Sequence, residues 1–526
     1  MAITSVVLRY LHALSPLISQ RHVLAKLGVW LLGSYTLGRT LYRFTNVLLY
    51  GPLSHLPGTT LSKVTMVQVK FSAIVGGLHY KTEADCRKYG DIYRIGPKSV
   101  VISNPADCKR VLGSHKFRKS RIYQNFAVVA DTTFSTRSAE LTHLRRKQIG
   151  PAFTHGHLRD MEPTILETGY LSLRNKWDNA IRRGGGEAQV NYCVHFLCTS
   201  FDIITALGYG EHFYALRDDR SKIMDWVQHT TQLCSLRLFF KNLAAFPLSL
   251  YTEPLIRSVE DLTKFSNTAI DKRHALLQIP GINKPKDILQ ALIDAKDSHI
   301  KMTRNQITAE NILFLIAGTD TTAMTLTWTL HYLLLHPDIH ERAVKSARGK
   351  FAHSHVITYA EAKAQLPLIE AIIYESLRIQ AVSSTPLPRV VPPEGATFQG
   401  HFLPGGTQIN VNIGGANHHQ PTWHQPHKFI PERFLQDDKA KQNVLTFSSG
   451  VRICPGRNLA HYEMLTILAN TLKNYDIRLP KDSLFVPARR DENGCPVVMP
   501  RNYNVTVGPR FPARDCRIVI RPAPLY

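Results

Sequence analysis

The sequence is poor in cysteine: eight of its 526 residues are Cys, and no two of them form a C-x-x-C pair. So few cysteines do not build a disulfide scaffold, and the missing pair argues against a structural zinc site. Internal repeats and low-complexity segments are absent as well. With 44% apolar and 20% charged residues, the composition excludes a disordered, a collagen-like or a polytopic membrane protein.

Acidic residues are also in short supply: 40 Asp and Glu stand against 64 Lys and Arg, which gives a formal charge of +24. The basic residues are scattered in twos and threes, as at 145–147, 182–183 and 489–490. No nucleic-acid-binding motif accompanies them, so we expect no nucleic acid partner. A basic surface that faces an anionic membrane or an acidic protein explains the charge equally well.

Long hydrophobic runs are missing too. In the apolar and aromatic segment 23–50, the longest uncharged stretch is 27–38, which is too short to cross a bilayer by itself. The charges that interrupt the segment, Lys26, Arg39 and Arg43, can reach a membrane interface. The segment therefore predicts a tilted or half-buried anchor helix; the alternative is an ordinary buried helix of the globular domain.

Turn-forming residues follow this segment directly, at Gly51-Pro52 and again at Leu56-Pro57-Gly58. They indicate a hinge between an anchor and a globular body. We therefore expect an N-terminal membrane anchor segment over 1–50 and one domain over 51–526. No small-residue cleavage site stands out, so a removable signal peptide is not expected.

Strand signals are confined to short regions, and helix signals fill the middle of the chain. Residues 91–103 have the pattern of a hairpin, and 397–412 alternate like strands around one turn. Helical signals dominate 140–350, and a last helix is expected near 459–473. This order predicts an α+β enzyme, mostly helical, rather than alternating βαβ units.

The strongest chemical signal is the stretch F-S-S-G-V-R-I-C-P-G, from Phe447 to Gly456. A metal-binding thiolate needs hydrogen-bond donors around its sulfur and a backbone that can approach a planar cofactor closely. Gly450 and Gly456 provide that backbone, and successive amide N–H groups can point at the sulfur of Cys454. Arg452 is placed to pair with a carboxylate at the edge of such a cofactor. A helix starting just after the cysteine would favour the thiolate.

A second signal is the long apolar helix expected over 308–335, which a capping box precedes and a proline follows. Ala317, Asp320 and Thr321 lie at i, i+3 and i+4, so they share one face. Small residues at Ala317 and Gly318 are expected to leave room for a small ligand beside that face. A carboxylate and a hydroxyl at such a gap form a short proton relay.

These two stretches resemble known motifs of the cytochrome P-450 family. The cysteine stretch matches every fixed position of the haem-thiolate loop, F-x-x-G-x-R-x-C-x-G, and Ala317–Thr322 looks like the oxygen-activation motif A-G-x-D/E-T-T. The resemblance implies that Cys454 is the axial ligand of the haem iron. It also implies that Asp320 feeds protons toward the oxygen under reduction and that Thr321 hydrogen-bonds it.

A third element has the order of the family pattern: E-x-x-R at Glu375 and Arg378, then P-E-R-F with Arg433, then the cysteine loop. An isolated E-x-x-R is usually a solvated ion pair of little worth. In the family, however, the second arginine joins the pair in a buried triad. The resemblance thus implies a structural, non-catalytic role for these three residues.

The resemblance also implies cofactor contacts outside the loop. Arg389 matches the family's arginine after the E-x-x-R helix, and Arg146 matches the arginine of the W/H-x-x-x-R helix, both as contacts of the haem propionates. Thr142 occupies the usual Trp or His position, which departs from the family pattern. Either Thr142 drops the contact, or His143 takes it over in a shifted register; otherwise His143 is a surface histidine.

The resemblance spans nearly the whole chain and implies the cytochrome P-450 fold, with a long central helix, a small β-rich region and the haem-thiolate loop. It implies a membrane-anchored monooxygenase that uses haem b, O2 and electrons from NADPH. These electrons would come through a separate NADPH-cytochrome P-450 reductase, with cytochrome b5 as a further partner. The expected location is the endoplasmic reticulum membrane, with the catalytic domain facing the cytosol. The carboxy-terminal half most resembles fungal microsomal members, which typically oxidise secondary metabolites or xenobiotics.

The segments expected to border the pocket are 122–130, 314–319 and 382–387. They are apolar with a few hydroxyls, which suits a hydrophobic small molecule. Two alternatives remain at this point. One is an O2-independent isomerase or dehydratase on the same fold, against which the intact Asp320 and Thr321 count. The other is a haem sensor or electron carrier without turnover.

Overall fold

The computed structural model describes residues 26–524 except 43, 241–242, 244–246, 298–299, 385 and 438. The longer helices are α3 (Val67–Ile74), α4 (Leu78–Tyr89), α5 (Pro105–Leu112), α6 (Ala139–Ile149), α7 (His155–Leu166), α8 (Ser172–Arg183), α9 (Tyr192–Tyr209), α11 (Lys222–Arg237), α12 (Leu248–Leu277), α14 (Arg304–Leu335), α15 (Pro337–Arg348), α17 (Pro367–Ile379) and α20 (Arg457–Asn474). The shorter ones are η1 (Asn46–Tyr50), α2 (Thr60–Val64), η2 (Arg121–Phe126), η3 (Gly150–Phe153), η4 (Glu167–Leu171), α10 (Ala215–Asp218), α13 (Ile288–Asp294), α16 (Tyr359–Gln365), α18 (Ile413–Asn417), α19 (Arg433–Gln436), η5 (Ala440–Asn443), η6 (Gly450–Arg452) and α21 (Pro512–Asp515).

The strands form small separate sheets. The largest has the order β1-β2-β9-β6, in which only the β2–β9 pair is parallel. Its strands are β1 (Ile92–Gly96), β2 (Ser99–Ile102), β6 (Leu387–Val390) and β9 (Gln408–Val411). The remaining strands are β3 (Ala188–Asn191), β4 (Lys296–Asp297), β5 (Ile300–Lys301), β7 (Ala396–Phe398), β8 (His401–Leu403), β10 (Tyr475–Arg478), β11 (Arg501–Asn504), β12 (Thr506–Pro509) and β13 (Arg517–Pro522).

This architecture confirms the predicted mostly helical α+β class and the predicted hairpin over 91–103. The region 397–412 differs from the prediction because it holds three strands and two turns rather than two strands around one turn. The additional turn lies between β7 and β8, where Gln399 and Gly400 both have positive φ angles, of 49° and 81°. A glutamine gives no sequence signal for that conformation, which is uncommon for residues other than glycine.

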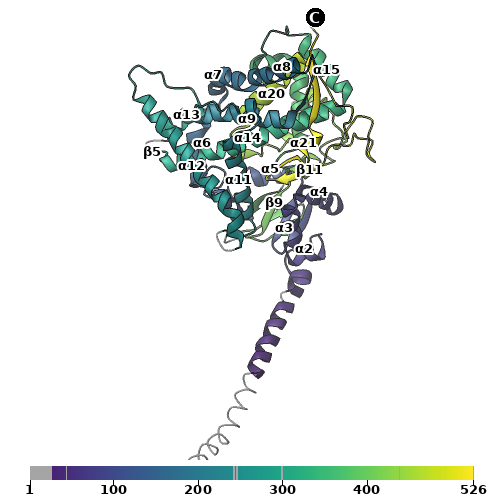
Figure 1. The fold of residues 1–526 in the computed structure, drawn as a ribbon. Helices are drawn as coiled ribbons and strands as arrows, with labels where there is room; N and C mark the ends of the chain where they lie inside the picture. The colour runs from purple at the N-terminus through teal and green to yellow at the C-terminus, as the bar shows by residue number, and fades with distance from the viewer. Residues whose placement is uncertain are drawn as a thin grey trace, which may run out of the picture.

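The long helix α14 runs through the middle of the body beside α9 (Figure 1). Thr303 and Gln306 close its N-terminus with the expected reciprocal capping box, and it ends just before Pro337. The helix is rich in threonine, and the hydroxyls of Thr325 and Thr329 each donate to the carbonyl four residues earlier, at 2.8 Å. Polar groups satisfied inside the helix can be buried at little cost, so α14 can occupy the core.

Gly318 determines how closely α14 approaches α9. A Cβ atom at this position would lie 2.9 Å from Cγ1 of Ile204 on α9, too close for a real contact. The expectation that Gly318 leaves room for a ligand is therefore wrong, because this glycine faces a neighbouring helix. Of the two small residues, only Ala317 is exposed.

Residues 26–42 form a helix that extends away from the body, beyond α2 and α3 (Figure 1). All of its described side chains are exposed, Trp30 to 76%, which excludes the alternative of a buried helix of the globular domain. Within the described ranges, no helix is both long and apolar enough to span a membrane.

Candidate active site

Cys454 lies in the short connection between η6 and α20, where the backbone is tightly folded. Its N–H donates to the carbonyl of Phe447 at 2.8 Å, and the N–H of Ile453 donates to the carbonyl of Gly450 at 3.1 Å. Gly450 has a φ of +59°, and a Cβ there would lie 2.4 Å from Cα of Gly113, which follows α5. This position therefore requires glycine both for its conformation and for the close approach of the two chain segments.

The environment of the Cys454 sulfur acts on its pKa in two directions. Burial raises the pKa of the thiol, whereas the backbone N–H groups of Gly456 and Arg457 and the positive charge of Arg146 lower it. The residue nevertheless has accessible surface, so the sulfur faces an opening inside the fold. A thiolate at this opening would be stabilised by amide donors at the start of α20, as the glycine-rich sequence predicts.

Four cations gather on one side of this loop, and we call Lys119, Arg146, Arg389 and Arg452 the cation cluster. Arg389 donates to the hydroxyl of Tyr123 at 2.8 Å, and Arg146 donates to the carbonyl of Ile453. Burial and the neighbouring Arg389 and Arg146 lower the pKa of Arg452 to about 10. No carboxylate among the described residues lies within ion-pair distance of the cluster. Such a cluster is suited to an anionic ligand.

The structure separates the two residues at the position that departs from the family pattern. Thr142 on α6 is fully buried, and its hydroxyl accepts a hydrogen bond from Arg452. His143 is exposed. Thr142 therefore supports the arginine of the cysteine loop directly, and the register does not shift toward His143.

On α14, the residues expected to form the proton relay lie close together. Asp320 and Thr321 are half-buried on the same face as the exposed Ala317. Burial alone raises the pKa of Asp320 to about 6. The hydroxyl of Thr321 donates to the carbonyl of Ala317 at 2.7 Å, so its oxygen remains able to accept. A carboxyl whose pKa is near neutral can both take up and release a proton at low cost.

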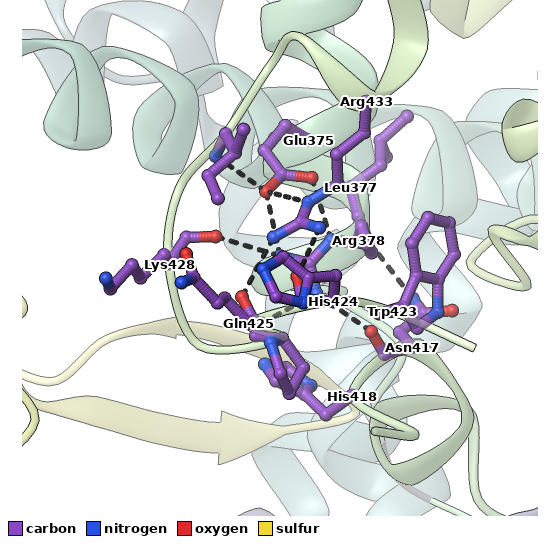
Figure 2. Close-up of polar contacts among 12 residues, drawn as sticks. Glu375, Leu377, Arg378, Asn417, His418, Trp423, His424, Gln425, Lys428 and Arg433 are labelled. Carbon is purple, nitrogen blue, oxygen red and sulfur yellow. Dashed lines mark hydrogen bonds and ion pairs between the residues drawn. The ribbon is translucent and has the colours of Figure 1, made fainter. Parts of the chain in front are cut away.

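Glu375, Arg378 and Arg433 meet in a compact ion-pair group (Figure 2). Arg378 donates from Nε and Nη2 to the two oxygens of Glu375, at 2.7 and 2.8 Å, and Arg433 donates from Nε at 3.3 Å. Both Glu375 and Arg378 have no exposed surface. The other donors of the two arginines bind backbone carbonyls between Asn417 and Lys428.

Asn417 connects this group to the cysteine loop. Arg378 binds its carbonyl at 2.9 Å, and its side-chain oxygen accepts from the N–H of Leu445 at 3.0 Å. Its side-chain nitrogen donates to the hydroxyl of Thr446 at 3.1 Å, next to Phe447. The ion-pair group thus positions the start of the loop that carries Cys454, through one buried asparagine.

Sequence reasoning missed Lys119 and Asn417, and it included Tyr123 only as a member of the pocket segment 122–130. No local motif marks them, because each acts on residues that are far away in the sequence.

Comparison with known proteins adds a direct assignment. A family model described as Cytochrome P450 matches residues 64–506. The chain belongs to the cytochrome P450 family. It is 38% identical to cytochrome P450 monooxygenase helB1 of Aspergillus fumigatus over 98% of this chain and 89% of that protein. To helB2 of the same fungus it is also 38% identical, over 91% and 96% of the two chains. The P450 is therefore a monooxygenase of this family.

Solved structures agree with the fold. The crystal structure of the cytochrome P450DA haem domain superposes with a TM-score of 0.73, covering 86% of this chain and 94% of that one at 17% identity. Members of the family carry a haem with a thiolate ligand and use O2 and reducing equivalents. The residues of this P450 fit such a group: a thiol ringed by amide donors lies beside a cluster of cations, and the Nε of Arg146 is buried without a partner in the described part of the chain.

The contact between Gly450 and Gly113 yields a first prediction. Gly450→Ala should cost about 1–3 kcal/mol from backbone strain alone, with a further loss from the clash, and should reduce the fraction of protein that holds haem. Gly156→Ala is the matched control, since Gly156 is exposed in α7, has no positive φ, and nothing lies within 4 Å of its new Cβ. Urea denaturation and haem absorbance measure both variants, and equal effects would contradict the assigned constraint.

A second prediction concerns the buried ion pairs. Glu375→Gln should destabilise the P450 by about 3–5 kcal/mol, because it leaves Arg378 buried without a counter-charge. The control is Arg257→Gln, which breaks a pair with Glu253 whose side chains are 71% and 60% exposed; it should cost less than about 1 kcal/mol. Thermal denaturation compares the two, and a loss for Glu375→Gln as small as that of the control would refute the structural role.

Proposed function

We propose that this P450 inserts one oxygen atom of O2 into a hydrophobic small molecule, as a haem-thiolate monooxygenase with Cys454 as the axial ligand of the haem iron. The observation that carries the proposal is the pair Asp320 and Thr321 on the face of α14 that keeps accessible surface. A proton relay is needed to reduce O2, so this pair counts against an O2-independent isomerase or dehydratase and against a haem sensor.

Several side chains would hold haem b in place. The cation cluster offers Arg146, Arg389 and Arg452 for the two propionates, and Thr142 orients the last of these. Phe447 and Gly456 flank the thiolate in the cysteine loop, and the amide donors of Gly456 and Arg457 reduce its charge density. When bound, the haem supplies the O2-binding metal, and its thiolate ligand favours O–O cleavage.

The protein's own part in the reaction is to move protons and exclude water. Asp320 takes up a proton, which its pKa of about 6 permits near neutral pH. Thr321 can pass a proton on, because its hydroxyl can donate its own hydrogen while Oγ1 accepts a hydrogen bond from the next proton carrier. The apolar segments 122–130 and 314–319 and the apolar part of 382–387 exclude bulk water and favour a hydrophobic substrate. Secondary-metabolite or xenobiotic oxidation is the work we infer for it.

Electrons would come from a separate protein, since members of this family draw on a redox partner. We infer the NADPH-cytochrome P450 reductase, with cytochrome b5 as a second donor. An excess of 24 positive charges suits docking of an acidic partner and contact with an anionic membrane.

Exposed apolar side chains support a membrane location. Trp30 and Tyr35 on the N-terminal helix are 76% and 63% exposed, and Phe71 and Ile74 on α3 are 65% and 61% exposed. Large exposed apolar patches mark interaction sites, and aromatic residues favour membrane interfaces. We infer an anchor over 1–50 with α3 as a second contact, at the endoplasmic reticulum membrane, with the domain over 51–526 facing the cytosol.

The proton relay is tested by coupling efficiency. Thr321→Ala should leave the haem spectra and substrate affinity nearly unchanged but divert electrons to hydrogen peroxide, because the positioned hydroxyl is lost. The yield of product per NADPH should fall by about 10²-fold or more, since a positioned proton donor contributes about 10²–10⁴ in rate. Asp320→Asn should slow turnover with less peroxide formation.

Thr329→Ala is the matched control, because Thr329 makes the same hydrogen bond within α14 but is buried away from the opening. Its coupling should equal that of the unmodified P450. Unchanged coupling in Thr321→Ala would instead favour the O2-independent isomerase or dehydratase.

Membrane attachment is tested by fractionation of cells that express the P450. Deleting residues 1–50 should release part of the protein, with haem retained, and adding Phe71→Glu with Ile74→Glu should release nearly all of it. Each apolar side chain lost from the interface is worth about 1.5–3 kcal/mol, about tenfold or more in partitioning. Leu484→Glu, at an exposed leucine elsewhere, should change nothing. Loss of haem in the truncated form would show that the N-terminus belongs to the core.

A further inference from the structure

Glu310 is a fully buried carboxylate on α14 that the proposed reaction does not use. It lies on the same face of the helix as Ala317, about two turns closer to the N-terminus. Its Oε1 accepts a hydrogen bond from the backbone N–H of Thr133 at 2.7 Å and another from the Thr133 hydroxyl at 2.9 Å. Burial raises the pKa of Glu310 to about 7.

Thr133 belongs to residues 131–136, which we call the 131–136 loop. This loop is folded on itself: Ser135 Oγ accepts from the N–H of Thr132 at 2.9 Å and donates to Asp131 at 3.0 Å, and the N–H of Ser135 donates to Thr132 Oγ1 at 3.1 Å. Because its own polar groups bond to one another, a link at Thr133 holds the whole loop.

The other side of the loop meets the cation cluster. Lys119 donates to the carbonyls of Thr133 and Phe134, at 3.3 and 2.5 Å. Its ammonium lies over the rings of Tyr123 and Phe134, 4.7 and 5.1 Å from their centroids. The two rings contact each other edge to face at 5.3 Å, and the hydroxyl of Tyr123 accepts from Arg389. The loop therefore joins α14 to the cluster through an aromatic pair.

Arg145 and Lys119 are the charged groups that act on Glu310, and Arg145 makes its own hydrogen bond elsewhere. Its Nε lies 3.8 Å from Oε1 of Glu310, beyond hydrogen-bond distance, whereas its Nη1 donates to Gln148 at 2.6 Å. Glu310 thus makes its hydrogen bonds to the loop, and Arg145 supplies charge compensation only.

We propose that Glu310 is a positioning residue: by accepting both hydrogen bonds of Thr133, it fixes the 131–136 loop and so places Phe134 and Tyr123 as one wall of the substrate pocket. The placement of the loop stands on the contacts above, and only its role in substrate selection rests on the proposed function. No reacting atom needs to touch Glu310.

Two variants of similar size separate the acceptor from the charge. Glu310→Gln keeps an oxygen acceptor without the negative charge; Glu310→Met removes the acceptor. We expect backbone hydrogen exchange in residues 131–136 of the haem-loaded P450 to become at least about tenfold faster in Glu310→Met, and to stay within about threefold in Glu310→Gln. Equal exchange in the two variants, whether slow or fast, would overturn the proposal.

Thr133→Val tests the same link from the loop side and keeps the measurement decisive if Glu310→Met fails to fold. It removes one of the two donors, so exchange in 131–136 should accelerate by less than in Glu310→Met but clearly above that of Glu310→Gln. Exchange like that of the unmodified P450 would overturn the proposal. Hydrogen exchange needs no turnover, so a failed monooxygenase assay leaves this result unaffected.

The effect on the pocket is measured with two haem ligands of different size, imidazole and 4-phenylimidazole. In Thr133→Val and Glu310→Met, the Kd of 4-phenylimidazole should rise by about tenfold, because the aromatic wall is no longer held, while that of imidazole stays within about twofold. Glu310→Gln should restore both values. Equal changes for the two ligands would show that the loop does not shape the pocket, and would overturn that part of the proposal.

Discussion

The carboxylate of Glu375 compensates the guanidinium group of Arg378, which is fully buried with it, and that of Arg433, whose side chain is 10% exposed. Because a buried charge is tolerated only when it is paired and hydrogen-bonded, this group admits very few arrangements of the chain around it. The remaining N–H groups of the arginines donate to backbone carbonyls between Asn417 and Lys428. Asn417 in turn makes side-chain hydrogen bonds to Leu445 and Thr446. The position of the cysteine loop therefore depends on an ion-pair group that takes no part in the chemistry.

The two sides of the active site differ in how charge is balanced. On the loop side, the cation cluster has no carboxylate partner among the described residues, and burial together with the repulsion of Arg389 and Arg146 lowers the pKa of Arg452. On the α14 side, Asp320 stands in apolar surroundings and burial raises its pKa. Each arrangement therefore costs folding free energy in the protein without its cofactor. Each also has the property that its expected role requires: the cation cluster attracts an anion, and Asp320 exchanges a proton readily.

Features that depend on a few adjacent residues could be predicted from the sequence. The capping box at Thr303, the hairpin over 91–103 and the glycine-rich cysteine loop depend on local conformation, and a strong local signal accompanies each. The neighbour that Gly318 faces could not be predicted, because it is Ile204, more than a hundred residues earlier in the chain. For the same reason, the contact of Glu310 with Thr133 and that of Thr142 with Arg452 could not be predicted, because tertiary packing determines both.

The contact of Gly318 with Ile204 also bears on how such an enzyme can diverge. Ile204 lies in the core on α9, against Gly318, and it limits how far the central helix can move toward α9. A smaller or differently branched side chain there would let α14 shift and carry Asp320 and Thr321 with it, since packed helices move as units. Natural variation at a residue that touches no ligand can therefore change the positions of Asp320 and Thr321. Selection can alter the enzyme in this way without changing the residues that line its pocket.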